Sequence, residues 1–163
     1  MTRDEFFVRQ AIIGDEPILR DLRLQAMSDS PAAFGSTYER ELARTTLDWQ
    51  RWLSPGITFL LEHGGRAVGL VAGRTDPIDP RIVHLMAMWV HPEVRGSGGA
   101  DALVAALIGW AEAQRAKSIC LDVIKSNVRA TRFYERHRFR PTGAETPRDD
   151  DGRVEVRMQL TLG

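Results

Sequence analysis

The sequence has little of what marks a secreted, membrane-spanning or strongly charged protein. One cysteine in 163 residues excludes an internal disulfide, which favours a reducing compartment. The 22 basic and 22 acidic residues give a formal net charge of zero, so no global charge draws the chain to nucleic acid or to an anionic membrane. No apolar run approaches membrane-spanning length, and residues 1–5 do not begin a signal peptide. A cytoplasmic protein without nucleic-acid or membrane partners is therefore expected.

Metal-ligand spacing and an activated cysteine are also missing. The four histidines, His63, His84, His91 and His137, are scattered along the chain, so we predict no metal site. Cys120 stands in an apolar run and is interpreted as a small buried hydrophobic residue rather than a nucleophile.

What is present is an ordinary globular composition, with 43% apolar and 27% charged residues. A chain of 163 residues has a suitable length for one domain, residues 1–163, with a core of its own. No repeat, low-complexity segment or linker divides it.

Apolar periodicity predicts the element order β-α-α-β-β-β-α-β-α-β-β. Helical spacing follows Asp15, an N-cap candidate, and ends at Ser30. It resumes near Ser36, where Ser36 and Glu39 have capping-box spacing, and stops at Pro55. The other two helices follow the glycine-rich turn at residues 95–100 and residue 127. Strands are expected at 6–11, 58–62, 67–73, 85–90, 119–124, 139–142 and 154–162, with a turn at 148–152. The fold class is α/β, a single domain with a mixed, mostly antiparallel sheet flanked by about four helices.

The glycine-rich turn organises the chain. The apolar run at residues 85–90 leads through Pro92 into Arg95-Gly96-Ser97-Gly98-Gly99-Ala100, and a long helix follows. The first amides of a helix lack internal partners and carry partial positive charge, so such a turn favours an anion. Glycine also lets the backbone approach a phosphate closely. The turn is not a Walker loop, because no Lys-Ser/Thr follows, and it does not match Gly-x-Gly-x-x-Gly.

Two segments together resemble the GNAT superfamily of acyl-CoA N-acyltransferases. The turn fits Arg/Gln-x-x-Gly-x-Gly/Ala at Arg95, Gly98 and Ala100. A second segment is similar to Asn-x-x-Ala-x-x-Phe-Tyr-x-x-x-Gly-Phe, with matches at Asn127, Ala130, Phe133, Tyr134 and Phe139. The two segments occur in the family's order and lie within residues 85–139, about a third of the chain.

The resemblance implies the roles of the cofactor residues. The backbone of residues 95–100 would hold the pyrophosphate of acetyl-CoA, and Met88, Trp89 and Val90 would run beside its pantetheine arm. Asn127, Ala130 and Phe133 would complete the cofactor site. Tyr134 would bind the cofactor and protonate the departing thiolate, since a phenol with a reference pKa of about 10 can protonate a thiolate of about 8.5. The structural alternatives are a helix N-cap for Asn127 and a core ring for Tyr134.

Four positions depart from the family pattern. Ser97 stands where a basic residue is common and Gly99 where a branched aliphatic is common, and a glycine inside a helix costs on the order of 1 kcal/mol. Asp101 would repel a bound phosphate. Arg138 stands where the family usually has glycine, at a position expected to be a left-handed C-cap.

The acceptor side is less defined. Many relatives place a glutamate on the central strand, but residues 85–90 contain no acid. His84, Asp122, Glu39 and Glu62 remain candidates for the general base, with Glu39 a weak first choice, and each is also explained as an ordinary surface or capping residue. Phe34 and Tyr38, with the tryptophans Trp49 and Trp52, are candidates for the wall of the acceptor site or for helix packing.

The prediction is an N-acetyltransferase that moves acetyl from acetyl-CoA directly to a primary amine of a small molecule. The absence of a carboxylate on the central strand favours an amine of low pKa, which needs little deprotonation. The alternatives are a protein N-terminal or lysine acetyltransferase, and a non-catalytic acyl-CoA sensor or interaction module. The family also suggests a homodimer.

Overall fold

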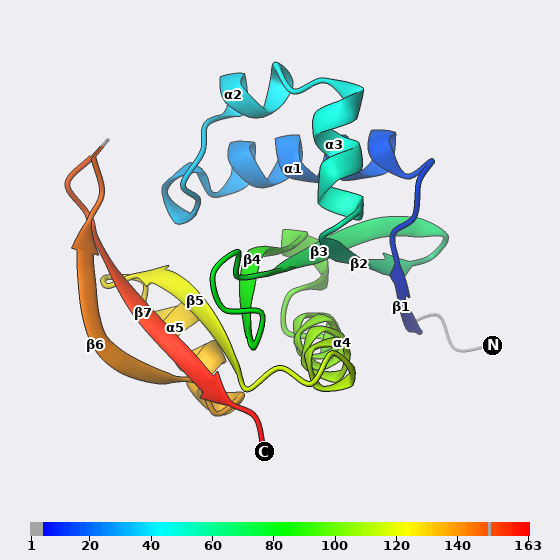
Figure 1. Cartoon of the computed structure of the whole chain (residues 1–163). Coiled ribbons are helices and arrows are strands. Elements are labelled where there is room, and N and C mark those ends of the chain that lie inside the picture. Colours follow the sequence, from blue (N-terminus) through cyan, green and yellow to red (C-terminus); the bar gives the residue numbers. More distant parts are fainter. Residues whose placement is uncertain (1–4, 150) are drawn as a thin grey trace. The chain divides into compact units, whose positions relative to one another are not determined.

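The computed structural model describes residues 5–149 and 151–163, and in these residues it has seven strands and five α-helices. The hydrogen-bonded strand order is β1-β2-β3-β4-β5-β7-β6. β5 pairs with β4 in parallel and with β7 antiparallel, and the pairs β1–β2, β2–β3 and β6–β7 are antiparallel. The predicted mixed, mostly antiparallel sheet is confirmed (Figure 1). Asp150, in the predicted turn at 148–152, lies outside the described residues.

The elements follow the predicted order closely. The strands are β1 (Phe6–Gln10), β2 (Ile57–His63), β3 (Arg66–Thr75), β4 (Ile82–Val90), β5 (Ser118–Ile124), β6 (Arg140–Pro147) and β7 (Val154–Thr161). The helices are α1 (Glu16–Asp29), α2 (Tyr38–Leu42), α3 (Thr46–Leu53), α4 (Gly99–Ala113) and α5 (Val128–Arg136), with short 3₁₀ turns at Pro31–Ala33 and Pro92–Val94. Among the described residues, no helix has the length and apolar character needed to cross a bilayer.

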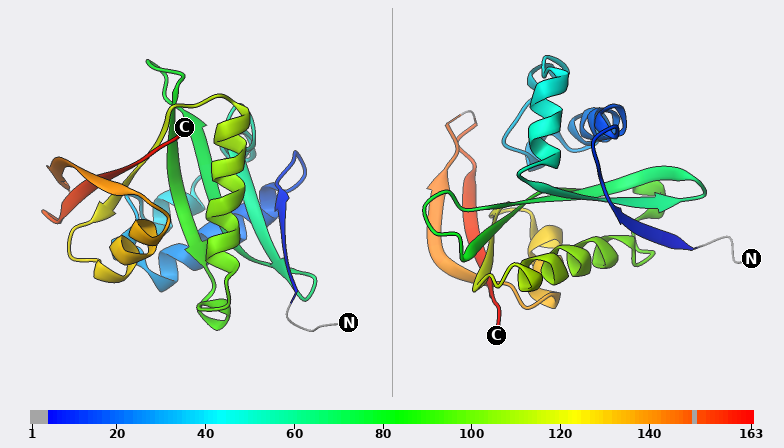
Figure 2. Two further views of the ribbon diagram at one scale, coloured as in Figure 1. Left: turned by 90° about the horizontal axis from the view of Figure 1, so that it is seen from below. Right: turned by 45° about the vertical axis from the view of Figure 1, so that its right-hand side comes forward.

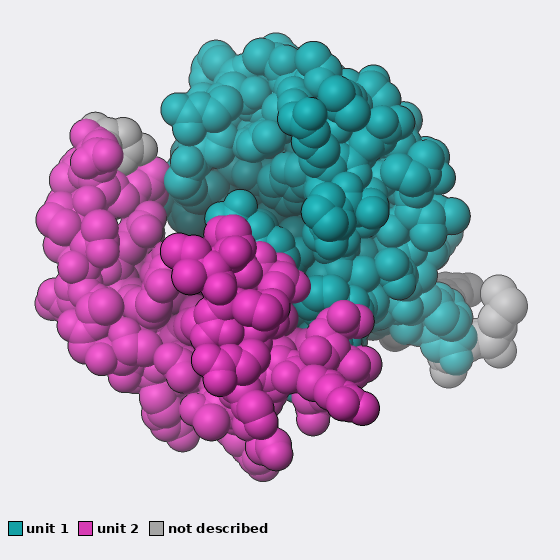
Figure 3. Space-filling view, viewed as in Figure 1, with its two compact units in different colours: residues 1–74, 85–110 teal, residues 75–84, 111–163 magenta. Residues whose placement is uncertain are grey.

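The chain forms two compact units, coloured separately in Figure 3. The first contains Met1–Arg74 and Leu85–Trp110. Within it, α1 and α3 lie on one side of β2 and β3, and α4 lies on the other (Figure 2). Leu19, Leu22 and Ala26 recur on one face of α1 and are at most 1% exposed in a core with Trp49 and other apolar residues. Burying each leucine stabilises the fold by about 1.5–3 kcal/mol.

The second unit contains Thr75–His84 and Ala111–Gly163. Its strands are the start of β4 together with β5, β7 and β6, and α5 lies beside them. In β5 every residue except Asp122 is buried, and in β7 Met158 and Leu160 are buried. Cys120 is 5% exposed and burial raises the pKa of its thiol, which confirms the interpretation as a buried hydrophobic residue.

The region between α1 and β2 differs from the prediction. One helix was expected between Ser36 and Pro55, but the chain forms α2 and α3 there, so the described residues contain five α-helices rather than about four. The predicted capping box at Ser36 is wrong, because the N-cap of α2 is Thr37, whose hydroxyl accepts from the Arg40 amide at 3.1 Å. A true capping box at Thr45 and Asp48 begins α3. This second N-cap begins a separate helix at Thr46, so the segment does not form one continuous helix.

The end of α5 confirms the predicted left-handed cap. Arg138 has φ +71°. The amide of Phe139 donates to the Tyr134 carbonyl at 3.1 Å, and the amide of Arg138 donates to the Glu135 carbonyl at 2.9 Å. These two bonds define a Schellman motif, and the rings of Tyr134 and Phe139, 5.7 Å apart, supply its apolar contact. The cap therefore requires a conformation that an arginine adopts at a cost of about 1–2 kcal/mol.

Replacing this arginine should stabilise the protein. In Arg138→Gly the left-handed strain disappears, while glycine adds chain entropy worth about 0.5–1 kcal/mol to the unfolded state. We expect a net gain of roughly 0.5–1 kcal/mol and a melting temperature higher by about 1–4 °C. Arg132→Gly, the same substitution at an exposed position inside α5, should lower the melting temperature instead. A decrease for Arg138→Gly would mean that the arginine side chain itself stabilises the cap.

Candidate active site

The glycine-rich turn has the backbone of an anion site. Gly96 and Gly98 have φ of +78° and +92°, values that favour glycine. The first intrahelical hydrogen bond of α4 runs from the Ala102 amide to the Gly98 carbonyl at 3.1 Å. The amides of Gly99 and Ala100 therefore precede the hydrogen-bonded part of the helix and can donate to an anion.

The three glycines of the turn have different surroundings. A Cβ at Gly96 or Gly98 would meet nothing within 4 Å, so the surface above both is open. A Cβ at Gly99 would lie 2.5 Å from Cδ2 of Leu61 on β2. Gly99 is also the first residue of α4 rather than an interior one, so the expected cost of a glycine inside the helix does not apply. Its small size instead lets α4 begin close to the sheet.

The Arg95 side chain is held within the protein. Its Nε donates to the Val90 carbonyl at 2.9 Å, and its guanidinium pairs with the Asp29 carboxylate at the end of α1. Burial alone would raise the pKa of Asp29, but hydrogen bonds from Trp89, Arg95 and Ser30 outweigh burial and lower it to about 2. Asp29 is therefore ionised at neutral pH and fixes Arg95, which ties the turn to β4 and α1.

The remaining side chains of the turn add no cation. The Ser97 hydroxyl donates to the Val94 carbonyl, and Asp101 places a carboxylate in the first turn of α4. The attraction for an anion in this segment therefore comes from backbone amides and the helix dipole. The geometry fits a pyrophosphate held by main-chain donors.

The strand before the turn is distorted. Ala87 has φ +58°, the left-handed value that alanine rarely adopts. Met88, Trp89 and Val90 follow directly, and the last two are 5% exposed. In the described part of the chain, the parallel register of β4 with β5 comprises three pairs and ends at His84 and Cys120. Beyond His84 no described register pair joins β4 to β5, while β4 remains the neighbour of β3 in the sheet and the Val90 carbonyl accepts from Arg95.

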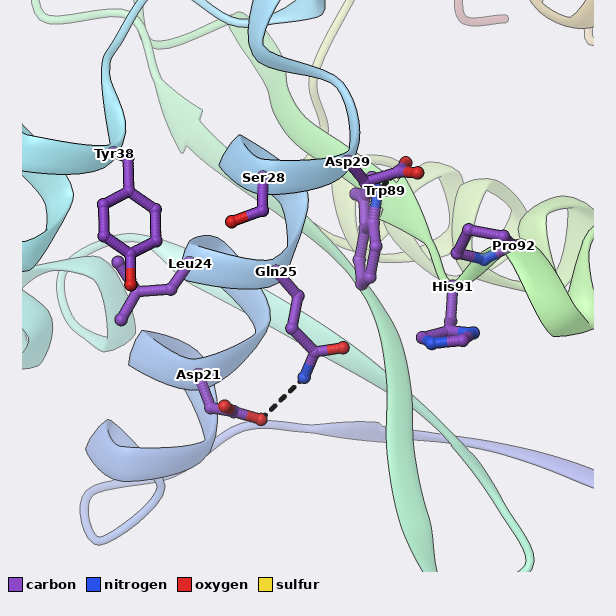
Figure 4. A pocket seen from close by; sticks show the side chains of 9 residues that line it. All are labelled: Asp21, Leu24, Gln25, Ser28, Asp29, Tyr38, Trp89, His91 and Pro92. Carbon is purple, nitrogen blue, oxygen red and sulfur yellow. Dashed lines mark hydrogen bonds between the residues drawn. The ribbon is translucent and has the colours of Figure 1, made fainter.

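A cavity of about 530 Å³ lies beside β4 within the first unit. Figure 4 shows Tyr38 and Leu24 on one side of it, Trp89 and His91 on the other, and the hydrogen-bonded pair Asp21 and Gln25 on α1. The lining combines two carboxylates and several aromatic rings with no arginine or lysine; its residues are Asp21, Leu24, Gln25, Ser28, Asp29, Tyr38, Trp89, His91 and Pro92. Such a wall suits a cationic ligand.

The other candidates for the acceptor wall lie elsewhere. The Arg23 guanidinium stacks between the rings of Phe34 and Trp52, 5.1 Å from each centroid. Trp49 is 2% exposed in the core, which favours the packing interpretation. Glu39 is an exposed residue of α2.

The second segment builds the start and the core of α5. The Asn127 side chain accepts from the Ala130 amide at 3.1 Å, which confirms its N-cap role. Tyr134 is 8% exposed, and its ring packs edge-on against Phe133 at 5.2 Å. Burial raises the pKa of the Tyr134 phenol well above its usual value. The phenol therefore stays protonated at neutral pH and is a weaker acid than reference values suggest.

A histidine–carboxylate pair stands at the start of β4. His84 Nε2 lies 2.8 Å from Asp76 Oδ2, and the two side chains are 20% and 23% exposed. Hydrogen bonds from the Asp79 amide, from His84 and from the Ile78 amide lower the pKa of Asp76 to about 2. Sequence reasoning named His84 as one base candidate among several and missed its partner, because nothing in the sequence fixes how the loop at 76–81 folds.

Comparison with known families decides the assignment. The model of the acetyltransferase (GNAT) family matches residues 22–139. The chain belongs to the GNAT family. It is therefore an acyltransferase, and acetyl-CoA is the co-substrate that this family uses.

Solved structures agree with the GNAT assignment at the level of the fold. An acetyltransferase of the GNAT family from Streptococcus pneumoniae superposes with a TM-score of 0.80 at 20% identity, covering 98% of this chain and 100% of that one. The putative acetyltransferase yncA from Salmonella typhimurium, solved with its cofactor acetyl-CoA, gives 0.80 at 19% identity, with 98% and 95% covered. A ribosomal-protein-alanine N-acetyltransferase from Brucella melitensis gives 0.79 at 19% identity, with 96% and 99% covered. None of the curated proteins compared with the chain matches it.

Proposed function

We propose that this GNAT protein transfers the acetyl group of acetyl-CoA to a primary amine of a small molecule. The main-chain donors of residues 95–100 hold the pyrophosphate, and the backbone of residues 88–90 binds the pantetheine arm. Asn127, Ala130 and Phe133 serve the same co-substrate. No covalent enzyme intermediate is needed when both substrates are held together.

The chemistry uses one proton donor of the chain. As the amine attacks, backbone amides of β4 stabilise the negative charge on the thioester oxygen. The thiolate then leaves and takes the proton of Tyr134. Burial makes a phenol a weaker acid, but removal from water also makes a thiolate a stronger base, so the two shifts act in compensating directions.

The cavity beside α1 is the observation that supports a small-molecule amine as the acceptor. Its volume of about 530 Å³ falls in the range of roughly 300–1,000 Å³ that small-molecule sites occupy. Asp21 supplies the negative charge, because the carboxylate of Asp29 is already paired with Arg95, and Tyr38 and Trp89 supply apolar area. A small aliphatic or aromatic amine, cationic in solution, matches this wall in size and in charge.

Removing the exposed carboxylate of Asp21 should weaken the binding of the amine only. We expect Asp21→Asn to raise KM for a cationic amine roughly 2- to 5-fold with kcat unchanged, since an exposed ion pair contributes about 0.2–1 kcal/mol. The effect should fade at high salt. Steady-state kinetics in the amine, with Glu112→Gln as an exposed control on α4, measures it. Equal KM values in the wild type and Asp21→Asn at low salt would remove the cavity from the acceptor site.

A protein acceptor is the principal alternative. The Brucella relative is named for a ribosomal-protein alanine, so an N-terminal amine is a natural competitor, and a protein lysine is another. A panel of small amines, N-terminal peptides and lysine peptides separates the three by kcat/KM. The proposal expects the highest value among the small amines, whereas a peptide preference of tenfold or more would reassign the acceptor.

A further inference from the structure

We infer that His91 determines acceptor specificity, because its ring N–H binds a neutral hydrogen-bond acceptor on the amine substrate. The substrate class is then an amine that also carries an amide carbonyl or a hydroxyl, as in an amino amide or an amino alcohol. This inference rests on the proposed acetyl transfer and adds the second functional group of its substrate. It starts from the place of His91 in the cavity lining, directly after the end of β4.

A hydrogen bond in the loop after β4 decides which ring nitrogen of His91 carries a hydrogen. The amide of Glu93 donates to Nδ1 of His91 at 3.1 Å, and this bond caps the 3₁₀ turn Pro92–Val94. An amide N–H donates only to a nitrogen with a free lone pair, so the hydrogen of the neutral ring is on Nε2. Nε2 is therefore a hydrogen-bond donor, and this atom cannot take a proton from the amine.

The ring of His91 is held in place by neighbours in the first unit. The backbone amide of His91 donates to the Val68 carbonyl on β3 at 2.8 Å. The ring meets that of Trp89 edge-on, with the centroids 6.0 Å apart and the planes at 75°. The Trp89 indole is itself fixed, because its N–H donates to Asp29 at 3.0 Å. A donor held in this way loses little conformational entropy when a ligand binds, so more of its hydrogen-bond energy appears as affinity.

The N–H at Nε2 of His91 is a donor of fixed direction that a ligand can use. The indole N–H of Trp89 and the amide nitrogen of Gln25 already donate to carboxylates, at 3.0 and 2.7 Å. The hydroxyls of Ser28 and Tyr38 rotate, so they donate or accept as a partner requires. Nε2 makes no hydrogen bond to any residue in the part of the chain that the structure describes. Figure 4 shows the ring on the side of the cavity opposite Tyr38.

The charge of the lining selects a neutral acceptor for this donor. Asp21 is exposed on α1, and the described lining contains no arginine or lysine. A carboxylate on the substrate would lose water without gaining a cation, and it would share the cavity with the Asp21 carboxylate. A carbonyl or hydroxyl oxygen accepts from the imidazole N–H without either cost. Asp21 and His91 together therefore match a small molecule that has a cationic amine and a neutral oxygen.

Two substitutions separate the roles of the two ring nitrogens of His91. In His91→Asn the side-chain carbonyl can still accept from the Glu93 amide, because asparagine is a strong N-cap, but the donor at the position of Nε2 is gone. In His91→Gln the longer side chain carries an amide N–H toward the position of Nε2 and gives up the cap on Glu93. The asparagine variant thus tests the substrate contact, and the glutamine variant tests the cap.

The test is kcat/KM, from thiol release with acetyl-CoA, for β-alaninamide, isoamylamine and β-alanine, which have nearly the same shape and differ in the group far from the amine. The wild type should prefer them in that order. The ratio of β-alaninamide to isoamylamine is then compared between proteins, so the intrinsic reactivities of the amines cancel. His91→Asn should lower this ratio about 3- to 10-fold, the value of one neutral hydrogen bond. His91→Gln should keep it within about twofold of the wild type and lower the melting temperature by the loss of the cap. The exposed control Glu112→Gln should match the wild type.

The possible outcomes separate this inference from the proposed function. A wild type that acetylates small amines, together with an unchanged ratio in His91→Asn, would overturn the inference and leave the proposed function standing. The same conclusion follows if the wild type accepts small amines but not β-alaninamide, or if both His91 variants lower the ratio equally, since His91 then acts only through the loop. A wild type that releases no thiol with any small amine would overturn the proposed function and the inference together.

Discussion

Gly98→Val is expected to abolish acetyl-CoA binding, with the dissociation constant raised at least about 100-fold, or about 2.8 kcal/mol. Gly98 has φ +92°, and the space a Cβ would enter is open in the protein. That space is where the pyrophosphate would approach the first amides of α4. A valine fills it and also forces the backbone from a conformation that β-branched residues avoid. Calorimetry with acetyl-CoA measures the loss.

A matched control separates lost binding from lost folding. Gly65, in the turn between β2 and β3, has φ +79° and equally open surroundings. Gly65→Val introduces a similar backbone strain away from the turn at residues 95–100, so it should lower the melting temperature without changing the affinity of the folded protein. Equal affinity in Gly98→Val and the wild type would remove the turn from the site.

Tyr134→Phe is expected to lower kcat by about 10²- to 10⁴-fold, the usual contribution of a general acid or base. The phenylalanine ring keeps the packing against Phe133 and Phe139, so folding and acetyl-CoA affinity should stay near those of the wild type. The hydroxyl is the only group removed. The loss should therefore appear in kcat with little change in the dissociation constant.

Two measurements make this result decisive. Solvent viscosity must leave kcat unchanged in both proteins, which shows that chemistry limits the rate. Calorimetry must show equal acetyl-CoA binding. If both conditions hold and kcat is the same in Tyr134→Phe, the phenol is a packing residue and sulfur is protonated by another group.

The elements that sequence could predict are those fixed by local patterns. The alternation in β7, the glycine turn between β2 and β3 and the cap at Asn127 each depend on neighbouring residues. The left-handed Arg138 was predictable because a helix that ends in a Schellman motif needs that conformation whatever residue occupies it. The start of α2 was misplaced, since Ser36 and Thr37 are both good caps and only the backbone decides between them, and the division between α2 and α3 at the capping box of Thr45 and Asp48 was missed.

The site features that sequence could not predict depend on contacts between distant residues. Arg95 pairs with Asp29, 66 positions away, and this contact makes its side chain a support of the turn. Buried Glu41, 0% exposed, pairs with Arg23 across two helices, although charged side chains are almost never fully buried unless they are paired. The pairing of His84 with Asp76 likewise follows from the shape of a loop. In each case the partner of a charge is set by tertiary packing.

Simultaneous counting of free thiol and N-acetylated amine, in one reaction with acetyl-CoA and a panel of amines, tests the central claim most directly. The account predicts one thiol released for each amide formed, with a small cationic amine as the best acceptor and no acetylated protein retained. Acetyl-CoA that binds but releases no thiol with any amine would contradict it and indicate a non-catalytic sensor.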